Sequence, residues 1–266
     1  RRQRQMCIRD RIKKSPLPFT TSTLQQEAAK TLNMSTKRTM NIAQQLYEGV
    51  DIKGRGTVGL ITYLRTDSTR VADEAKTASK DYISENYGEK YLPQSSNTKK
   101  DDKKIQDAHE AIRPTDLSLS PALVKESLQR DQFRLYQLIW KRFVASQMAP
   151  AQYETTSVRI GAGEYIFTVS ASKIVFDGFM SVYKSDDDNE ETNALAKGLD
   201  ENSVLTLDDV NGTQHFTQPP AHFTEASLVK ALEEQGIGRP STYAPTISTI
   251  IARHYVCLLY TSDAAD

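Results

Sequence analysis

The chain has 266 residues, of which 34 are Lys or Arg, 34 are Asp or Glu, and 38% are hydrophobic. This length allows one large domain or a few small ones. The zero net charge gives no general sign of a nucleic-acid-binding surface, and no apolar run approaches the roughly 18 residues of a membrane helix. The two cysteines lie near opposite ends, so we expect a cytoplasmic protein without a disulfide framework.

The first third of the chain is predicted to be mainly helical. Helix starts are marked by capping spacings such as Ser22 with Gln25, and helix stops by glycine. In chain order we expect an extended entry over residues 1–18, a helix from Ser22, and a second helix over 37–48 with Met40, Ala43 and Tyr47 on its apolar face. A strand over 57–63 and a third helix from Ser68 or Thr69 to Gly88 follow.

In the remaining two thirds, the predicted secondary structure changes from mainly helical to β-rich after Pro150. Before it, Ser120 and Pro121 have the pattern of an N-cap followed by a first helical residue. The expected elements are a surface loop over 92–104, a helical stretch from Pro121 to 148, a β-rich stretch over 152–183, an acidic loop over 184–201, a strand over 203–210, a helix over 225–235 capped by Thr224, and a last helix within 238–256. This order predicts a multi-domain α+β protein.

The stretch "GLITYLRTDS" (59–68) is the strongest candidate for chemistry. In a strand, Tyr63 and Arg65 would project to the same side, with Thr66, Asp67 and Ser68 at the turn into a helix whose N-terminus attracts anions. A phenol with a pKa of about 10 is a poor nucleophile at neutral pH, but a guanidinium stabilises phenolate and holds a phosphate oxygen. The pattern therefore suggests attack on a phosphodiester. The alternative is a buried tyrosine beside an Arg–Asp surface pair.

Five segments, in this order, resemble the type IA DNA topoisomerases, and most of all the bacterial topoisomerase I form. They are "PFTTSTLQQEAAKTL" (18–32), "QQLYEG" (44–49), "ITYLRTD" (61–67), "DAHEAIRPT" (107–115) and "FTEASLVKALEEQGIGRPSTYAPTISTI" (223–250). The resemblance covers residues 15–256. It implies an enzyme that cuts and reseals one DNA strand through a 5′-phosphotyrosyl intermediate, and so relaxes negative supercoils without ATP.

The resemblance also implies roles for four catalytic residues. Tyr63 stands at the position of the attacking tyrosine, and Arg65 would steady the charge of the phosphate. Asp67 would orient Arg65 or relay charge. His109 would lie near the tyrosine and bond to the scissile region, although a lone His in such a sequence is otherwise structural.

DNA contacts are expected from two further segments. Arg113 can contact a phosphate or only fix its own loop, and Glu110, which can pair with either arginine, is given no role. Two glycines allow close backbone approach in the segment that lines the single-strand groove of the family. Its expected DNA-binding residues are Arg239, Ser241, Thr242 and Tyr243, of which Tyr243 can stack on a base or pack inward. Residues 20–23 are taken as plain helix caps outside the site.

The fold implied by the resemblance is a helical tyrosine-bearing domain inserted in a β-rich arch, followed by a helical segment of the DNA groove. The expected domains are an arch strand at 1–19, the helical catalytic domain at 20–150, the β-rich arch at 151–220, the groove segment at 221–256 and a non-native tail, including Cys257, at 257–266. The chain starts at Arg1 and is expected to be an internal piece of a longer protein. We expect a monomer whose partner is a single-stranded DNA segment at the nucleoid, with no membrane.

The family implies Mg²⁺, held by an acidic cluster that we expect upstream of this sequence. The acidic run 185–191 is taken as a solvated loop, so no metal ligand is assigned within the chain, and the chain alone is not expected to relax DNA. The alternatives are an inactive DNA-binding fragment and the core of a reverse gyrase or topoisomerase III. A tyrosine recombinase is rejected, because three residues rather than two separate His109 from Arg113 and the tyrosine precedes them.

Overall fold

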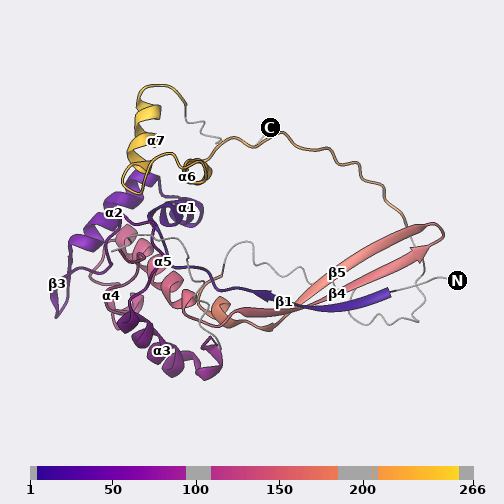
Figure 1. Cartoon of the computed structure of the whole chain (residues 1–266), viewed down its shortest axis with the longest axis horizontal. Helices are drawn as coiled ribbons and strands as arrows, with labels where there is room; N and C mark the ends of the chain where they lie inside the picture. The colour runs from indigo at the N-terminus through magenta and orange to yellow at the C-terminus, as the bar shows by residue number, and fades with distance from the viewer. Residues whose placement is uncertain (1–4, 94–108, 185–205, 207–208, 258–266) are drawn as a thin grey trace. The chain divides into compact units, whose positions relative to one another are not determined.

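The computed structural model describes residues 5–93, 109–184, 206 and 209–257. The chain has a mixed α/β fold in two compact units (Figure 1). The first unit comprises Arg1–Pro16, Ile83–Ser96 and Gln147–Ala221, and the second comprises Leu17–Tyr82, Asn97–Ser146 and His222–Asp266. The loop predicted over 92–104, the acidic loop and the strand predicted over 203–210 lie wholly or largely outside the described residues. The domain boundaries given above stay predictions.

The first unit is built on a three-stranded antiparallel sheet. Its strand order is β1 (Gln5–Lys13), β4 (Ala151–Ala162) and β5 (Tyr165–Phe176). β4 and β5 form the long hairpin in Figure 1, turning at Gly163, whose φ of 65° suits glycine. Two short 3-10 turns, η1 (Glu89–Tyr91) and η2 (Gly178–Ser181), complete the unit. The extended entry and the β-rich stretch are therefore confirmed.

The second unit begins with α1 (Thr21–Leu32), which starts one residue before the predicted Ser22. The N-cap is Thr20, which forms a capping box with Thr23: the Thr20 hydroxyl accepts from the Thr23 N–H at 3.3 Å, and the Thr23 hydroxyl accepts from the Thr20 N–H at 2.9 Å. The predicted pair of Ser22 and Gln25 is wrong because this threonine pair already caps the helix. Both Ser22 and Gln25 are buried instead.

The second helix, α2 (Thr36–Glu48), ends at Gly49 as predicted, where φ is 126°. Its predicted apolar face is largely wrong. Only Ala43 of the three proposed residues is buried, whereas Met40 is half-buried and Tyr47 is exposed. The buried face is made by Thr36, Thr39, Ile42, Ala43 and Leu46. Met40 and Tyr47 therefore lie outside the buried face of α2.

After α2 the chain forms a small hairpin of β2 (Val50–Ile52) and β3 (Gly56–Val58). The strand predicted over 57–63 is wrong beyond Val58, and α3 (Asp73–Tyr87) begins later than predicted. Hydroxyl groups explain the delay, because Thr66 accepts from the N–H of Ser68, and Ser68 accepts from the N–H of Arg70, both at 3.1 Å. Such local bonds compete with helix formation. The helix end before Gly88, where φ is 94°, is confirmed.

The core of the second unit lies around α5 (Arg130–Ser146), which packs against α1 and α2 (Figure 1). The helical stretch predicted from Pro121 is interrupted, because α4 (Pro121–Val124) is short and α5 begins only at Arg130. The fully buried residues of α5 include Leu135, Tyr136, Ile139 and Val144. None of the described helices is long and apolar enough to cross a membrane.

Two C-terminal helices complete the unit. They are α6 (Glu225–Glu234), capped by Thr224 as predicted, and α7 (Tyr243–Ala252). α6 packs on α1 and α7 contacts α2 (Figure 1). Two carboxylates fasten α6: Glu225 accepts from the Thr36 N–H at 2.7 Å, and Glu233 accepts from the Ser22 hydroxyl at 2.6 Å.

Tyr136 joins α5 to the segment before α4. Its side chain is fully buried, and its hydroxyl donates to the carbonyl oxygen of Leu119 at 2.6 Å. Burial, and less strongly the charge of Asp116, raises the pKa of this phenol. A raised pKa means that the folded state favours the protonated form. Its stabilising contribution is therefore present below pH of about 10 and is lost as the pH rises further.

We expect Tyr136→Phe to lower the free energy of unfolding by about 1–2 kcal/mol at pH 7, because the buried Leu119 carbonyl loses its donor. Urea denaturation measures this value, and the difference from wild type should narrow above pH of about 10. Tyr165→Phe is the matched control, since Tyr165 is 73% exposed and its loss of a hydroxyl should change stability by less than about 0.5 kcal/mol. Equal stability of Tyr136→Phe and wild type would contradict the expectation.

Candidate active site

Residues 62–68 form no regular element, yet their side chains alternate between inside and outside. Leu64, Thr66 and Ser68 are buried, whereas the side chain that precedes each of them is exposed, namely those of Tyr63, Arg65 and Asp67. The sequence predicted that Tyr63 and Arg65 project together from a strand. The strand is absent, but the alternation of side chains persists and leaves all three candidate catalytic residues of this segment open to solvent.

The segment that carries His109 lies against residues 61–62. Ile61 forms an isolated antiparallel bridge with Pro114. The Thr62 N–H donates to the Arg113 carbonyl at 2.9 Å, and the Thr62 hydroxyl donates to the Ala111 carbonyl at 2.8 Å. These bonds bring together two motifs that are more than 40 residues apart in the sequence.

Tyr63 sits between two aromatic rings. The ring of His109 stacks on it, with centroids 5.4 Å apart and an angle of 27° between planes, and the ring of Tyr47 meets it edge-on at 5.6 Å and 70°. Tyr63 nevertheless stays 39% exposed. The two contacts orient the phenol while its face toward solvent remains open, as an attacking group requires. His109 thus lies beside Tyr63, as the resemblance implied.

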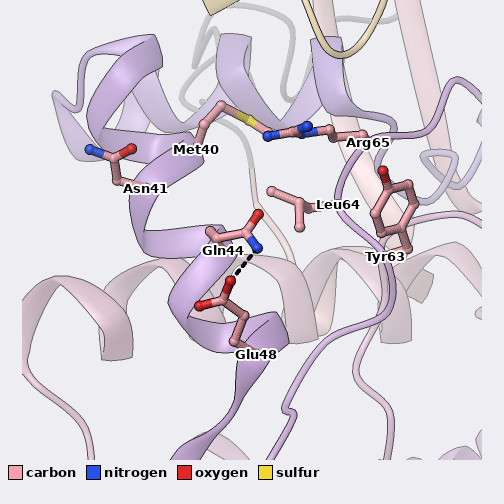
Figure 2. Close-up of a pocket in the computed structure, with 7 residues that line it drawn as sticks. All are labelled: Met40, Asn41, Gln44, Glu48, Tyr63, Leu64 and Arg65. Carbon is pink, nitrogen blue, oxygen red and sulfur yellow. Dashed lines mark hydrogen bonds between the residues drawn. The ribbon is translucent and has the colours of Figure 1, made fainter.

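A cavity of about 300 Å³ opens beside this phenol (Figure 2). One side comes from α2 and the other from the irregular segment, and the lining residues are Met40, Asn41, Gln44, Glu48, Tyr63, Leu64 and Arg65. The Gln44 amide donates to the Glu48 carboxylate at 2.6 Å. Sequence reasoning gave no site role to the α2 residues. The spacing of Met40, Gln44 and Glu48, each four residues apart, is the signal that places them on one helix face.

Arg65 lines this cavity and makes no hydrogen bond or ion pair with any other residue that the structure describes. An unpaired, exposed guanidinium can receive a phosphate oxygen. The expected pairing of Asp67 with Arg65 is likewise not seen within the described residues. Asp67 instead lies close enough to Tyr243 to affect it: burial first, then the charges of Glu233 and Asp67, raise the pKa of Tyr243, while Arg239 lowers it.

Arg113 is engaged within its own loop. Its side chain is 14% exposed and contacts the Glu110 carboxylate at 2.6 Å through Nη2, and a second nitrogen donates to the Pro114 carbonyl at 2.9 Å. This geometry favours the alternative in which Arg113 fixes the loop. It also gives Glu110 a partner that the sequence left open. The DNA-binding role of Arg113 stays a prediction that this geometry does not favour.

The predicted groove residues precede and begin α7. Arg239, Ser241 and Thr242 are exposed, and the Thr242 hydroxyl accepts from the Arg239 N–H at 2.8 Å. Tyr243 takes the inward alternative: it is 6% exposed and packs with Val229 and Ile247. Its ring is not available to stack on a base in this conformation, so its predicted DNA contact is not supported. The other three remain predictions with exposed side chains.

The described residues do not fit the Mg²⁺ that the family implies. Within these ranges no group of three or more His, Cys, Asp or Glu side chains converges. Glu48, the acidic residue that lines the cavity, is bonded to Gln44. The described part of the chain therefore supports no catalytic step through a metal ion.

The comparisons with known proteins concern the chain as a whole and its family. A family model described as DNA topoisomerase matches residues 5–261. The structure is also similar to that of full-length topoisomerase I from Thermotoga maritima, with 38% sequence identity and a TM-score of 0.77. That match covers 97% of this chain, but the chain spans only 42% of the length of the Thermotoga protein. The chain belongs to the type IA DNA topoisomerases.

Proposed function

We propose that this chain carries the strand-breaking centre of a DNA topoisomerase, with Tyr63 as the nucleophile. The observation that carries the proposal is the placement of Tyr63: an exposed phenol, oriented by Tyr47 and His109, beside a cavity that is also lined by Arg65, which pairs with no other described residue. Membership of the topoisomerase family makes DNA the substrate class. The proposed reaction is an isomerisation of DNA topology that needs no ATP.

The reaction is a balanced transesterification. The Tyr63 oxygen forms a bond to a backbone phosphorus, and the bond from that phosphorus to the 3′ oxygen breaks. The phenol gives up one proton and the 3′ oxygen takes up one, so the net proton count is unchanged. The phosphotyrosine retains the ester, and the 3′ hydroxyl reverses the step to reseal the strand.

The neighbours of Tyr63 supply the remaining roles. Arg65 can bind the non-bridging oxygens and stabilise charge that develops on the phosphate. His109, stacked on the phenol, is the nearest imidazole that can bond to the scissile region. Mg²⁺ would supply further stabilisation of phosphate charge, from ligands outside the described residues. We assign Asp67 no step, because no hydrogen bond or ion pair joins it to Arg65 among the described residues.

Around this centre, the proposed architecture is that of the family. The helical unit would carry the tyrosine, the β-rich hairpin would form part of an arch, and α6 with the turn before α7 would border a groove for one DNA strand. The whole protein is proposed to act as a monomer on a single-stranded segment. Relaxation of supercoils is assigned to that whole protein, since this chain spans 42% of the matched structure.

The test is to trap and map the adduct. A chimera in which residues 5–261 replace the matching region of the Thermotoga maritima topoisomerase I is incubated with Mg²⁺ and a single strand labelled at its 3′ end, then denatured. The label stays on the protein if the linkage is to the 5′ phosphate. We expect the labelled peptide to contain Tyr63. Label on any other residue, or none, would refute the proposal.

For DNA binding, we expect Arg239→Ala to weaken affinity for single-stranded DNA and to reduce the slope of log K against log salt by about 0.7, the value for one phosphate contact on a single strand. Fluorescence anisotropy over a salt series measures both quantities. Arg253→Ala removes a charge at the other end of α7 and should leave the slope unchanged. A wild-type slope in Arg239→Ala would show that the turn before α7 is not in the groove.

A further inference from the structure

The backbone around Arg65 is attached to the first residue of α1. The Thr21 hydroxyl donates to the carbonyls of Leu64 at 2.7 Å and Thr66 at 3.0 Å, and it accepts from the Thr66 N–H at 2.9 Å. The Thr21 N–H donates to the same Thr66 carbonyl at 2.9 Å. Thr21 therefore bonds the peptide groups on both sides of Arg65.

This attachment replaces a missing strand partner. Residues 62–68 belong to no strand or helix, so their peptide groups have no regular ladder to satisfy them. Thr21 is fully buried, and water has no access to take the place of its hydroxyl. One side chain thus fixes where the chain runs between Leu64 and Thr66, and with it the base of the Arg65 side chain.

The position of Thr21 is fixed in turn by its helix. The capping box of Thr20 and Thr23 holds the first turn of α1, and Ser22, the next residue, is bonded to Glu233 of α6. The run of hydroxyl residues 20–23, which the sequence suggested were plain caps, therefore has divided tasks. Thr20 and Thr23 cap the helix, Ser22 holds α6, and Thr21 holds the segment of Arg65.

We propose that Thr21 is a positioning residue for the proposed reaction, which sets the place of Arg65 relative to Tyr63. This inference rests on the proposed function, because positioning has a catalytic meaning only if Tyr63 attacks DNA. Thr21 touches neither substrate nor reacting atom. It acts through the Leu64 and Thr66 peptides, while Thr62 anchors the other side of Tyr63 to the His109 segment.

The anchor itself is tested without DNA, on the chain as it is. Thr21→Val keeps the shape and removes the hydroxyl, whereas Thr21→Ser keeps the hydroxyl. Amide hydrogen exchange, measured on ¹⁵N-threonine-labelled protein, should be about tenfold faster at Thr66 in Thr21→Val and unchanged in Thr21→Ser. Thr31→Val is the matched control, since the Thr31 hydroxyl bonds only within α1, to the Glu27 carbonyl.

The catalytic consequence is tested in the chimera, by separating binding from chemistry. Thr21→Val should slow single-turnover adduct formation by about ten- to a hundredfold while the Kd for the single strand stays within about twofold. Thr21→Ser should restore the rate to within about threefold of wild type. A loss caused only by weaker folding would lower binding and rate together, so an unchanged Kd beside a slower rate separates positioning from folding.

A wild-type rate in Thr21→Val, or unchanged exchange at Thr66, overturns the positioning role. If Thr21→Val does not fold, Thr21→Ala and Thr21→Ser are compared in its place, and equal rates in these two overturn it as well. If the unmodified chimera forms no adduct at Tyr63, the proposed function fails and the catalytic role of Thr21 fails with it. The exchange at Thr66 then still shows whether the anchor exists.

Discussion

Tyr63→Phe is expected to abolish the covalent adduct completely while leaving the affinity for single-stranded DNA within about twofold of wild type. Phenylalanine keeps the ring that stacks on His109 and meets Tyr47, so the surroundings should not change. It lacks only the oxygen that the proposed reaction joins to phosphorus. The measurement is the trapping of 3′-labelled strand on the denatured chimera, with anisotropy to follow binding.

Tyr47→Phe is the matched control for this substitution. Tyr47 is the other tyrosine at the site, equally 39% exposed, and it touches Tyr63 through its ring. Removing its hydroxyl should therefore preserve the adduct. If the adduct survives in Tyr63→Phe but is lost in Tyr47→Phe, the nucleophile has been assigned to the wrong tyrosine.

Arg65→Ala should lower the rate of adduct formation by about a hundred- to a thousandfold, the usual effect of removing one group that stabilises charge in a transition state. Binding should weaken much less, because many phosphates along the strand contribute to affinity. Arg65 makes no bond with another described residue, so its loss should not destabilise the fold. Single-turnover kinetics at saturating DNA isolates the chemical step.

Two further variants test whether the position of Arg65, or only its charge, controls the reaction. Arg65→Lys retains the charge but not the planar pair of donors, so its rate should fall between those of alanine and wild type. Arg55→Ala removes an exposed arginine of the same unit, 51% exposed and paired with Asp116, and should react at the wild-type rate. Equal losses in Arg55→Ala and Arg65→Ala would mean that general charge, rather than the place of Arg65, controls the reaction.

The structure extends the sequence reasoning most where several elements meet. The cavity beside Tyr63 needs α2, whose Gln44 and Glu48 lie opposite Arg65. Both residues stand in the segment "QQLYEG" (44–49), yet the sequence assigns them no role, because a motif does not say which face of a helix turns toward a neighbour. Tyr47 was misplaced for the same reason: an aromatic residue at helical spacing is predicted to be core, yet in this fold it supports the phenol.

Local hydrogen bonding decided several boundaries that pattern could not. Thr66 and Ser68 use their hydroxyls on nearby N–H groups and so delay α3 to Asp73. Thr20 and Thr23 form a capping box that the Ser22 and Gln25 spacing concealed. Side-chain hydroxyls act over two or three residues in ways that several spacings allow equally well.

The sequence by itself determined the family, the identity of the candidate nucleophile and most helices. Ordered motifs and the periodicity of apolar residues are properties of the chain alone, and Gly49 and Gly88 mark helix ends by their own backbone freedom. The tertiary structure alone decided that His109 stacks on Tyr63, that Arg113 is bonded to Glu110, that Tyr243 faces inward, and that Thr21 holds the segment of Arg65. Each of these depends on contacts between side chains or segments whose relative positions and orientations are set by packing, which no local pattern encodes.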